Sequence, residues 1–485
     1  MRSAQAKGTR VRAGRAMACL AVAVAATTLS ACGGGGGGGG TGPDPVPSPT
    51  PIVKPNIILV VLDDLDASAE ATMPRLRSLL ADQGVSFTNT MMAMPLCAPN
   101  RATIFTGQFP HNHGVTDQAG AQRIQQLESN LLPVWLKQAG YRTSLAGKYI
   151  NQYPSGAEAA IPPGWDDWHG VLENRAASSY DYWINDNSVV SYQHAYQTDL
   201  LTERAVDFIS KAGSSPFFLL VAPGAPHSPA EPAERHVGAY TGHGAPRTAD
   251  FNEDDMSDKP RWIRGLPLLT DQQIDEIDRL YWRRLESLMA VEDMLDRILQ
   301  TLTSNQQLSR TWIFFTTDNG VFHGQHRMPG GKAAVYDPAS RVPLLVRGPG
   351  VPAGRVLPHL VGTVDLAATF LALAGQNADS LDGKSLLPLL GSSPTSPEQW
   401  RKEMLAESFL VRSPVSIPEY SSIRTDRYTF VDIPSWVEQE LYDLATDPYQ
   451  TRNLVRADPA AAQPIVATLQ PRLDALRRCR AASCR

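Results

Sequence analysis

The run Asn56–Leu62 (NIILVVL) limits most strongly how this chain of 485 residues can fold. Six of its seven residues are aliphatic, whereas a strand with one solvent-exposed face would alternate apolar and polar residues. The run therefore predicts a strand that is buried on both faces. Similar short apolar runs recur along the chain, separated by segments with helical periodicity. This alternation predicts crossover connections and a mainly parallel sheet, with any chemistry at the carboxyl ends of its strands.

Further elements follow the same pattern. We expect strands at residues 144–146, 217–222, 312–316 and 342–346, and helices at residues 72–81, 131–139, 199–212, 271–302 and 364–374. In the first helix, Thr72 is the expected N-cap, Pro74 fits the first turn and Gly84 follows the end. After residue 391 the pattern changes to short strand-like pieces such as 427–431, followed by a helix at 459–477. The sequence thus predicts an α/β fold in which helices flank the sheet, with a smaller C-terminal subdomain.

The first 31 residues have the features of a signal peptide. Positive residues precede an apolar core from Met17 to Leu29. Residues 29–32 (LSAC) resemble the bacterial lipobox, which implies cleavage before Cys32 and a diacylglycerol on its thiol. An ordinary secretory signal with a chance cysteine is the alternative. A Gly- and Pro-rich linker, residues 32–53, comes next and is typical of a stalk. We therefore expect export and a lipid anchor in the bacterial cell envelope, in the periplasm or at the outer membrane.

Charge and cysteine content narrow the possible functions. The formal net charge is −5 and no basic block is present, which disfavours nucleic-acid binding. Beyond the N-terminal segment the chain has three cysteines. Cys479 and Cys484 lie close together and would form a small disulfide in an oxidising compartment, or remain as two free thiols. Cys97 then has no partner, and an unpaired cysteine in an exported protein needs an explanation.

Two acidic pairs follow predicted strands. Asp63-Asp64 come directly after the first strand, and Asp318-Asn319 follow the strand at 312–316. If these two strands are parallel neighbours, four oxygen-bearing side chains meet at one edge of the sheet. Carboxylate and amide oxygens without His or Cys suit a hard cation, so calcium fits better than zinc. Each pair taken alone could instead simply cap the turn after its strand.

Cys97 begins a segment that can form a helix, because Pro99 suits a first helical turn. A side chain at a helix N-terminus lies among free N–H groups, which favour a bound anion. Arg101, one turn further on, could direct its guanidinium at the same anion. The alternative is that Cys97 is a buried structural thiol.

Residues 97–107 (CAPNRATIFTG) resemble the sulfatase signature C-x-P-x-R-x-x-x-x-T-G. The resemblance extends over residues 54–454, and its motifs occur in the order found in the family. They are Asp63-Asp64, Gly147-Lys148, residues 225–229, residues 317–320, Gly331-Lys332, residues 341–344, residues 441–444 and Asp447-Pro448. Residues 147–151 and 162–165 are most similar to N-acetylglucosamine-6-sulfatases and heparan endosulfatases.

This resemblance implies an alkaline-phosphatase-like catalytic domain at residues 54–391, with a C-terminal subdomain at residues 392–485. It also implies that a maturation enzyme converts Cys97 to formylglycine (3-oxoalanine). In the family, one hydroxyl of the hydrated aldehyde attacks sulfur, and loss of the proton from the other hydroxyl expels sulfate. The implied calcium ligands are Asp63, Asp64, Asp318, Asn319 and the formylglycine oxygen at position 97.

The resemblance assigns roles to four further residues. Arg101 orients the formylglycine, and Lys148 and Lys332 contact sulfate oxygens. His227 protonates the leaving oxygen, which a histidine can do near neutral pH. Without the motifs, the lysines would be read as ordinary surface charges and His227 as a solvated loop residue.

Several positions depart from the usual pattern. Ile150 stands where many sulfatases have a histidine, and we expect Asn151 to replace that histidine as a polar contact. Asn100 stands where serine is usual, which bears on how efficiently Cys97 is modified. His323 is one place later than in the most similar branch, so no role is assigned to it. His111 and His113, which follow the signature, are expected to make structural hydrogen bonds.

The implied reaction is hydrolysis of a sulfuric ester on a carbohydrate, with N-acetylglucosamine 6-sulfate units as the leading substrate. Candidate substrate contacts lie in a loop-rich segment, where the alternative is that they only cover the core: Asn252, Arg261, Trp262 and Arg264. The other enzymatic interpretations are an aryl sulfatase and a phosphonate or phosphodiester hydrolase of the same superfamily. A lipoprotein that binds sulfated glycans without cleaving them is the non-enzymatic alternative.

Overall fold

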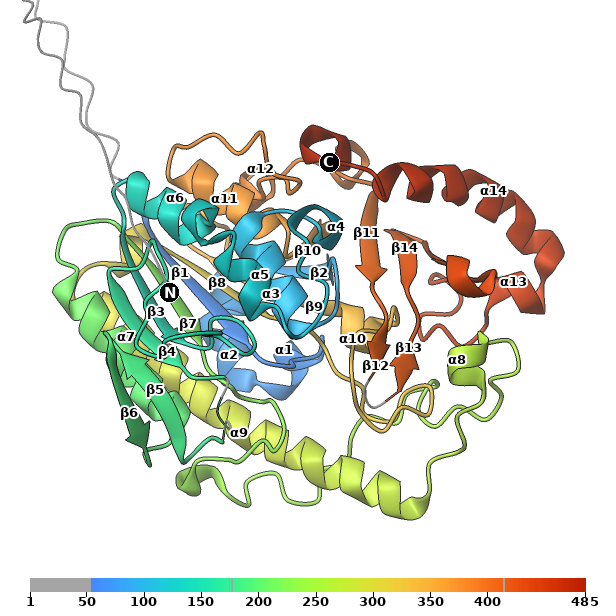
Figure 1. The fold of residues 1–485 in the computed structure, drawn as a ribbon, viewed down its shortest axis with the longest axis horizontal. Coiled ribbons are helices and arrows are strands. Elements are labelled where there is room, and N and C mark those ends of the chain that lie inside the picture. Colours follow the sequence, from blue (N-terminus) through green and yellow to red (C-terminus); the bar gives the residue numbers. More distant parts are fainter. Residues whose placement is uncertain (1–53, 174, 176–177, 413–414) are drawn as a thin grey trace, which may run out of the picture. The chain divides into compact units, whose positions relative to one another are not determined.

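The computed structural model describes residues 54–485, apart from residues 174, 176–177 and 413–414 (Figure 1). The predicted signal peptide, the proposed lipidation site at Cys32 and the linker 32–53 lie outside the described residues. None of the described helices is long and apolar enough to cross a membrane.

Ten strands form one large sheet in the order β10-β2-β9-β8-β1-β7-β3-β4-β5-β6 (Figure 1). Their bounds are Asn56–Leu62 (β1), Val85–Met91 (β2), Arg142–Gly147 (β3), Asp167–Val171 (β4), Tyr182–Asp186 (β5), Val189–Gln193 (β6), Phe217–Ala222 (β7), Thr311–Thr317 (β8), Arg341–Arg347 (β9) and Arg355–Gly362 (β10). The central strands β8, β1, β7, β3 and β4 are parallel, as the alternation predicted. Strand β9 is antiparallel to β2 and β8, and β5 and β6 are antiparallel at one edge. The predicted α/β fold is confirmed, with antiparallel strands beside a parallel centre.

Strand β1 lies at the middle of the sheet and all seven of its residues are buried. Its side chains alternate between two hydrophobic clusters. Ile57, Leu59 and Val61 belong to the cluster that includes residues of α3, α6 and α11. Ile58 and Val60 belong to the cluster that includes residues of α2, α7 and α9. Because both faces of β1 are covered by helices, its sequence has no polar alternation.

Helices flank the sheet on both faces. Those of the large domain span Ala69–Thr72 (α1), Pro74–Leu79 (α2), Cys97–Thr106 (α3), Pro110–His113 (α4), Ala121–Gln125 (α5), Leu132–Gln138 (α6), Gln197–Lys211 (α7), Arg261–Arg264 (α8), Asp271–Ser304 (α9), Asp337–Ser340 (α10), Asp365–Leu373 (α11) and Leu387–Leu390 (α12). The 34-residue helix α9 begins with a capping box in which Thr270 accepts from the Gln273 backbone N–H.

The helix expected at residues 72–81 is shorter than predicted. It begins at Pro74 and ends at Leu79, and its N-cap is Met73, which makes no side-chain capping bond. Thr72 is not the cap, because it ends the preceding turn and its hydroxyl donates to the Ser68 carbonyl (3.2 Å). Proline at the first helical position lacks an N–H, so this end has one fewer donor to satisfy.

The C-terminal part contains a second, antiparallel sheet in the order β11-β14-β15-β16 (Figure 1). Its elements span Glu403–Ser408 (β11), Tyr420–Thr425 (β14), Tyr428–Ile433 (β15), Glu438–Asp443 (β16), Leu454–Ala457 (α13) and Pro459–Leu476 (α14), with a small hairpin of Val411–Arg412 (β12) and Ser416–Ile417 (β13). Cys479 and Cys484 form a disulfide. Both half-cystines are buried in a hydrophobic cluster that also contains Met91 and Leu360 from the large sheet, so the two sheets share a core.

Candidate active site

The two acidic pairs meet at the carboxyl end of neighbouring strands. Leu62 at the end of β1 is the register partner of Thr317 at the end of β8, and the strands are parallel. Asp63 and Asp64 therefore come beside Asp318, whose Oδ1 accepts from the Asp64 backbone N–H (3.2 Å). Asp64 has φ +68°, a left-handed conformation that Asp and Asn tolerate better than most residues. The sharp turn it makes brings both carboxylates to the same edge of the sheet.

This cluster has the composition of a cation site. One ligand atom each from Asp63, Asp64, Cys97 and Asp318 lies within 4.8 Å of the others, and all four residues are buried. The amide of Asn319 adjoins them, because its Nδ2 donates to Asp64 Oδ1. Its Oδ1 is buried and has no hydrogen-bond partner. A buried acceptor of this kind needs a donor or a cation, and oxygen-rich sites suit hard divalent ions.

Cys97 begins helix α3, as the sequence predicted, and lies at the edge of the acidic cluster. Leu96 is the extended N-cap residue and Gly107, with φ +64°, ends the helix. Cys97 is the free cysteine among the described residues, and its side chain is fully buried. Its Sγ lies 3.7 Å from Asp63 Oδ1 and 2.8 Å from Lys332 Nζ. Burial and the Asp318 charge raise the pKa of the thiol to about 12, so it stays protonated.

Three cations surround the three carboxylates. Lys148, which follows β3, contacts Asp63 Oδ2 through its Nζ (2.7 Å). Arg101 of α3 donates from Nε to Asp318 Oδ2 (2.8 Å) and from Nη1 to the Lys148 carbonyl (2.9 Å). Lys332 Nζ lies 2.5 Å from Asp64 Oδ1. The geometry thus brings together Arg101, Lys148 and Lys332 with the oxygen-bearing side chains named from the sequence, from five separate segments.

Each ion pair shifts the pKa of its partners. Burial disfavours ionisation of Asp63, but the neighbouring positive charges, Lys148 foremost, together outweigh it and hold the pKa of Asp63 well below its usual value. Burial likewise opposes the charge of Lys332, yet the surrounding negative charges, Asp64 foremost, together keep the pKa of that lysine well above its usual value. Asp318 differs, because burial and the nearby Asp63 charge raise its pKa despite Arg101. The centre is therefore a dense set of compensating charges in a dry environment.

His227 lies at the mouth of this centre, on the loop after β7. Its Nε2 is 3.6 Å from Asp64 Oδ2, and its side chain is 43% exposed. The other ring nitrogen, Nδ1, lies 2.7 Å from the Ser228 carbonyl oxygen. Because a carbonyl can only accept, Nδ1 carries the hydrogen in the neutral ring. The second proton of an imidazolium would therefore lie on Nε2, the nitrogen that faces the acidic cluster.

A cavity of about 280 Å³ opens over these groups. It is lined by Asp63, Lys148, Asn151, Glu173, Ser178, Ser179, Gln197, Gly224, His227, Ser228 and Pro229. Asn151, expected as a polar contact, is among them, and its Oδ1 is buried without a hydrogen-bond partner. The cavity can therefore hold a small polar ligand group against both Lys148 and His227.

The other candidate substrate contacts make bonds elsewhere, and none of them is among the residues lining this cavity. Asn252 bonds the backbone of Leu269, accepting from its N–H at 2.8 Å. Trp262 stacks on Tyr336 with ring centroids 6.1 Å apart. Arg264 donates to the Lys259 carbonyl (3.3 Å), and Arg261 lies 3.3 Å from the Glu438 carboxylate of the C-terminal sheet. Substrate contact by these residues stays a prediction.

The remaining histidines near the signature motifs, and Asn100, have polar partners within the protein. His111 bonds Glu407 and the Cys479 carbonyl, and His113 bonds Thr103 and the Val115 N–H. Both make the structural hydrogen bonds that were expected. His323 is buried, with its Nε2 3.3 Å from Asp66. Asn100 is buried and accepts from the Thr363 hydroxyl (2.5 Å).

Two residues near the centre were not predicted. Arg284 of α9 is buried and donates from Nη1 to the Pro226 carbonyl (2.8 Å) and from Nη2 to the Asp64 carbonyl. Glu173 lies 3.6 Å from Lys148 on the cavity wall. Arg284 sits in an amphipathic helix whose charged residues are expected to face solvent, and Glu173 belongs to no motif. No local signal in the sequence distinguishes either one.

Comparison with known proteins agrees with this geometry. The family described as Sulfatase matches residues 55–376, and the one described as N-sulphoglucosamine sulphohydrolase, C-terminal, matches residues 324–479. The chain is 31% identical to an N-acetylglucosamine-6-sulfatase of Capra hircus over 89% of this chain and 85% of that protein.

Two solved structures share the fold. One, described as a complex with its substrate D-glucosamine-2-N,6-O-disulfate, has a TM-score of 0.77 and 25% identity, covering 88% of this chain and 98% of the other. The phosphonate monoester hydrolase of Agrobacterium radiobacter has a TM-score of 0.70 and 22% identity, covering 87% and 96%, and shows the fold alone. With the family match spanning most of the described chain and the acidic cluster meeting at Cys97, the protein belongs to the sulfatase family and is a sulfuric ester hydrolase.

Proposed function

We propose that this sulfatase releases sulfate from a sulfated carbohydrate, with N-acetylglucosamine 6-sulfate units as its substrate, and that Cys97 acts as formylglycine. One observation carries the proposal: Cys97 lies buried against three carboxylates and Lys332, under a cavity lined by Lys148 and His227. Relatives named N-acetylglucosamine-6-sulfatase, and a solved complex with a glucosamine disulfate, support the choice of sugar.

The residues present fit the two groups that the reaction needs. Asp63, Asp64, Asp318 and the unpartnered Oδ1 of Asn319 would hold a calcium ion, which supplies positive charge next to the sulfate. A formylglycine at position 97 supplies a hydrated aldehyde as the nucleophile. The Cys97 thiol is a poor nucleophile as it stands, since its pKa is raised to about 12. Conversion requires a maturation enzyme, which is the partner we propose.

The cations of the chain bind and orient the substrate. If a bound cation neutralised the carboxylates, the ammonium groups of Lys148 and Lys332 would be available to sulfate oxygens. Arg101 stays anchored by Asp318 and the Lys148 carbonyl, while its Nη2 is buried and has no partner. That free donor would be available to hold the side chain at position 97. All three cations act in a buried setting, where electrostatic stabilisation is strong.

His227 is proposed as the group that protonates the leaving sugar oxygen. The bond from Nδ1–H to the Ser228 carbonyl holds the ring with Nε2 toward the acidic cluster. Since a sugar alkoxide is a poor leaving group, proton donation to it contributes to the rate. Asn151, whose Oδ1 lacks a partner, would accept from a hydroxyl or amide of the sugar. Asn252, Trp262 and Arg264 do not line the cavity, so they would contact only a substrate that extends beyond it.

An aryl sulfatase and a phosphonate or phosphodiester hydrolase remain the alternatives within the superfamily. Matched 4-nitrophenyl sulfate and phosphodiester substrates would separate the two ester classes by their kcat/KM ratio. N-acetylglucosamine 6-sulfate as a third substrate would distinguish a carbohydrate sulfatase from an aryl sulfatase. A higher kcat/KM for the phosphodiester would contradict the proposal.

Mass spectrometry of the peptide that contains Cys97 tests the mechanism directly. In active protein from a host with the maturation enzyme, we expect the mass of formylglycine at this position. Cys97→Ser, produced in the same host, is the matched control and should be inactive while folding normally. An unmodified thiol in fully active protein would refute the assignment of the nucleophile.

We also propose that residues 54–391 form the catalytic domain and residues 392–485 the C-terminal subdomain, because the antiparallel sheet begins at Glu403. Export as a lipoprotein anchored through Cys32 is part of the same proposal and rests on the sequence alone. Metabolic labelling with a palmitate analogue, compared between the wild type and Cys32→Ser, would test the anchor.

A further inference from the structure

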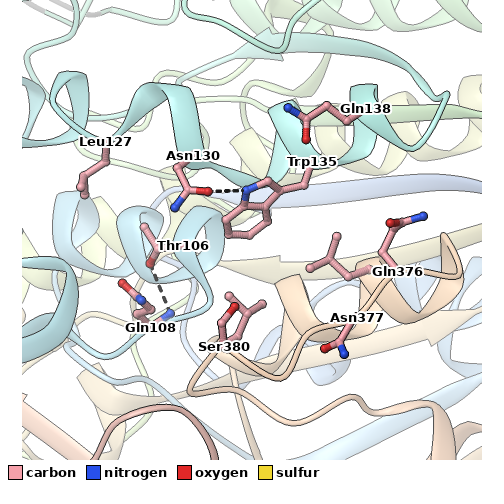
Figure 2. A pocket seen from close by; sticks show the side chains of 11 residues that line it. Thr106, Gln108, Leu127, Asn130, Trp135, Gln138, Gln376, Asn377 and Ser380 are labelled. Carbon is pink, nitrogen blue, oxygen red and sulfur yellow. Dashed lines mark hydrogen bonds between the residues drawn. The ribbon is translucent and has the colours of Figure 1, made fainter.

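Away from the catalytic cavity, two more cavities flank one surface segment, residues 376–385. The first has a volume of about 370 Å³ and lies between the C-terminal ends of α3 and α11 and the α6 region (Figure 2). Thr106, which lines it, ends α3, whereas Cys97 begins that helix. A ten-residue helix is about 15 Å long, so this cavity is well separated from the nucleophile. It shares no lining residue with the catalytic cavity.

The chemistry of this first cavity is that of a site for an uncharged sugar. Five of its lining side chains are amides, and none of its described lining residues is charged: Thr106, Gln108, Leu127, Asn130, Trp135, Gln138, Leu371, Gln376, Asn377, Ser380 and Leu381. Figure 2 shows the Trp135 indole between Asn130 and the 376–380 segment. Its N–H is already bonded to Asn130 Oδ1 (2.8 Å), so the ring presents mainly its apolar face. An aromatic face with amide donors and acceptors around it suits a ring that has both C–H and hydroxyl surfaces.

The second cavity, of about 360 Å³, is strongly basic. Its lining includes one acidic side chain, Glu403, and five basic side chains: Lys384, Arg401, Lys402, Arg472 and Arg485. This cluster of positive side chains contrasts with the formal net charge of the whole chain, which is −5. Arg401 is neutralised by a bidentate pair with Asp365 (2.7 and 2.8 Å), and Arg472 contacts Glu403. In the described part of the chain, no ion pair involves Lys384 or Lys402.

The charge of Lys384 has no ion-pair partner among the described residues of this cavity. The ammonium of Lys384 lies over the Trp400 ring, 4.1 Å from its centroid. Burial and the nearby charge of Arg401 lower the pKa of Lys384. The Nε of Arg401 is buried and has no hydrogen-bond partner, although the rest of its guanidinium is bonded. An anion in this cavity would relieve the repulsion between cations.

The two cavities are close enough to contact one ligand. Helix α11 has nine residues and is therefore about 13 Å long. Leu371, which lines the first cavity, lies near one end of this helix. Asp365 lies at the other end and binds Arg401, which lines the basic cavity. Arg485 of the basic cavity donates to the carbonyls of Ala378 and Leu381, in the segment that borders the first. A single extended molecule could therefore cover both.

We propose that these two cavities form a second binding surface for an anionic polysaccharide, in which an uncharged sugar face lies on Trp135 and a sulfate or uronate group lies among Lys384, Lys402 and Arg401. This inference rests on the proposed function, since it assigns a long form of the sulfated carbohydrate substrate. The surface holds the polymer near the enzyme and takes no part in the chemistry. It increases the effective concentration of sulfate esters at the catalytic cavity.

The test measures binding separately from catalysis. A heparan sulfate octasaccharide is titrated by calorimetry into the Cys97→Ser protein, which is the parent. The lysine double variant of this parent carries Lys384→Glu and Lys402→Glu, and a second variant carries Trp135→Ala. Arg297→Glu on the exposed side of α9 is the matched charge-reversal control. We expect about tenfold weaker binding for the lysine pair and for Trp135→Ala, and unchanged binding for the control. Affinity should also fall with salt in the parent, and less steeply in the lysine double variant.

The same substitutions in the catalytically competent chain complete the test. The KM for the octasaccharide should rise, whereas kcat/KM for N-acetylglucosamine 6-sulfate should stay at the wild-type value. Unchanged octasaccharide binding in either surface variant, or equal binding of a DNA oligonucleotide of the same charge, would overturn the proposal. If the wild type hydrolyses no sulfate ester, yet the surface variants bind the octasaccharide more weakly, the proposed function fails and the second surface stands.

Discussion

Leu62 and Thr317 are register partners at the ends of two adjacent parallel strands, although 255 positions separate them in the chain. The Thr317 hydroxyl donates to the Leu62 carbonyl (3.0 Å), which joins the two strand ends. The acidic residues that follow each strand are therefore held side by side. Bringing three carboxylates together in a buried place is costly unless positive charge compensates them. In the described chain Lys148, Arg101 and Lys332 provide that charge.

Replacing one of these carboxylates should weaken cation binding. Asp64→Asn keeps a residue that tolerates φ +68° but removes a charged ligand, and calcium affinity depends on ligand charge. We expect calcium to raise the Tm of the wild type, and to raise that of Asp64→Asn much less at the same concentration. Differential scanning calorimetry with calcium and with a chelator measures both shifts. The exposed Asp82→Asn is the control, and an identical calcium response in all three proteins would contradict the prediction.

Arg284 should stabilise the two loops that carry Asp64 and His227. Its guanidinium satisfies the buried carbonyls of Asp64 and Pro226, which lie on the loops that carry the Asp63-Asp64 pair and His227 respectively. Arg284→Met removes both donors, and a buried acceptor left without a partner costs about 1–3 kcal/mol. We therefore expect a loss of about 2–5 kcal/mol in the free energy of unfolding, measured with urea.

The neighbouring residue offers a control for that experiment. Arg283→Met on the same helix turn should change stability by less than about 1 kcal/mol, because Arg283 is only partly buried. Arg284→Met should also bind calcium more weakly, since the Asp64 loop loses its support. Equal stability of the two methionine variants would show that Arg284 does not hold these loops.

The decrease in kcat that follows replacement of His227 should depend on the leaving group of the substrate. The sugar oxygen of a carbohydrate sulfate needs a proton as it departs, whereas 4-nitrophenolate leaves readily without one. His227→Ala should therefore lower kcat for the sugar sulfate about 10²- to 10⁴-fold, and lower it far less for 4-nitrophenyl sulfate. Steady-state kinetics on the two substrates provides the comparison, with the exposed His243→Ala as the control. An equal loss on both esters would indicate a positioning role instead.

His113 should make the protein sensitive to acid. Burial lowers the pKa of its imidazole to about 3, and its Nδ1 already accepts from the Val115 N–H. The unfolded chain, with an ordinary histidine pKa of about 6.5, therefore binds more protons between pH 6.5 and 3. Stability contributed by the neutral ring is complete above pH 6.5 and declines as the pH falls through this window, by up to about 5 kcal/mol.

Urea unfolding at several pH values tests this contribution. His113→Gln, which cannot titrate, should show a shallower decline than the wild type between pH 6.5 and 4. The carboxylates titrate in both proteins, so the difference between the two curves isolates His113. Parallel curves would refute the proposed proton linkage.

The sequence by itself determined the central strands and the residues that meet around Cys97. These features are encoded locally: the uninterrupted apolar run 56–62, the acidic residues directly after it, and the signature at residues 97–107. Motif order along the chain was enough to name Lys148, His227 and Lys332, which the structure brings to one centre. Local patterns predict these features because a continuous apolar run is typical of a strand covered on both faces, and because turn residues act within a few positions of the strand end.

Only the tertiary structure decided which distant residues complete the site. Arg284 reaches the Asp64 carbonyl across 220 positions, and a charged residue on a long amphipathic helix gives no sign of that contact. The same holds for Trp262, which packs on Tyr336, and for the antiparallel course of β9, whose apolar sequence suits either direction. Strand direction and side-chain partners depend on long-range packing, which periodicity and propensity do not record.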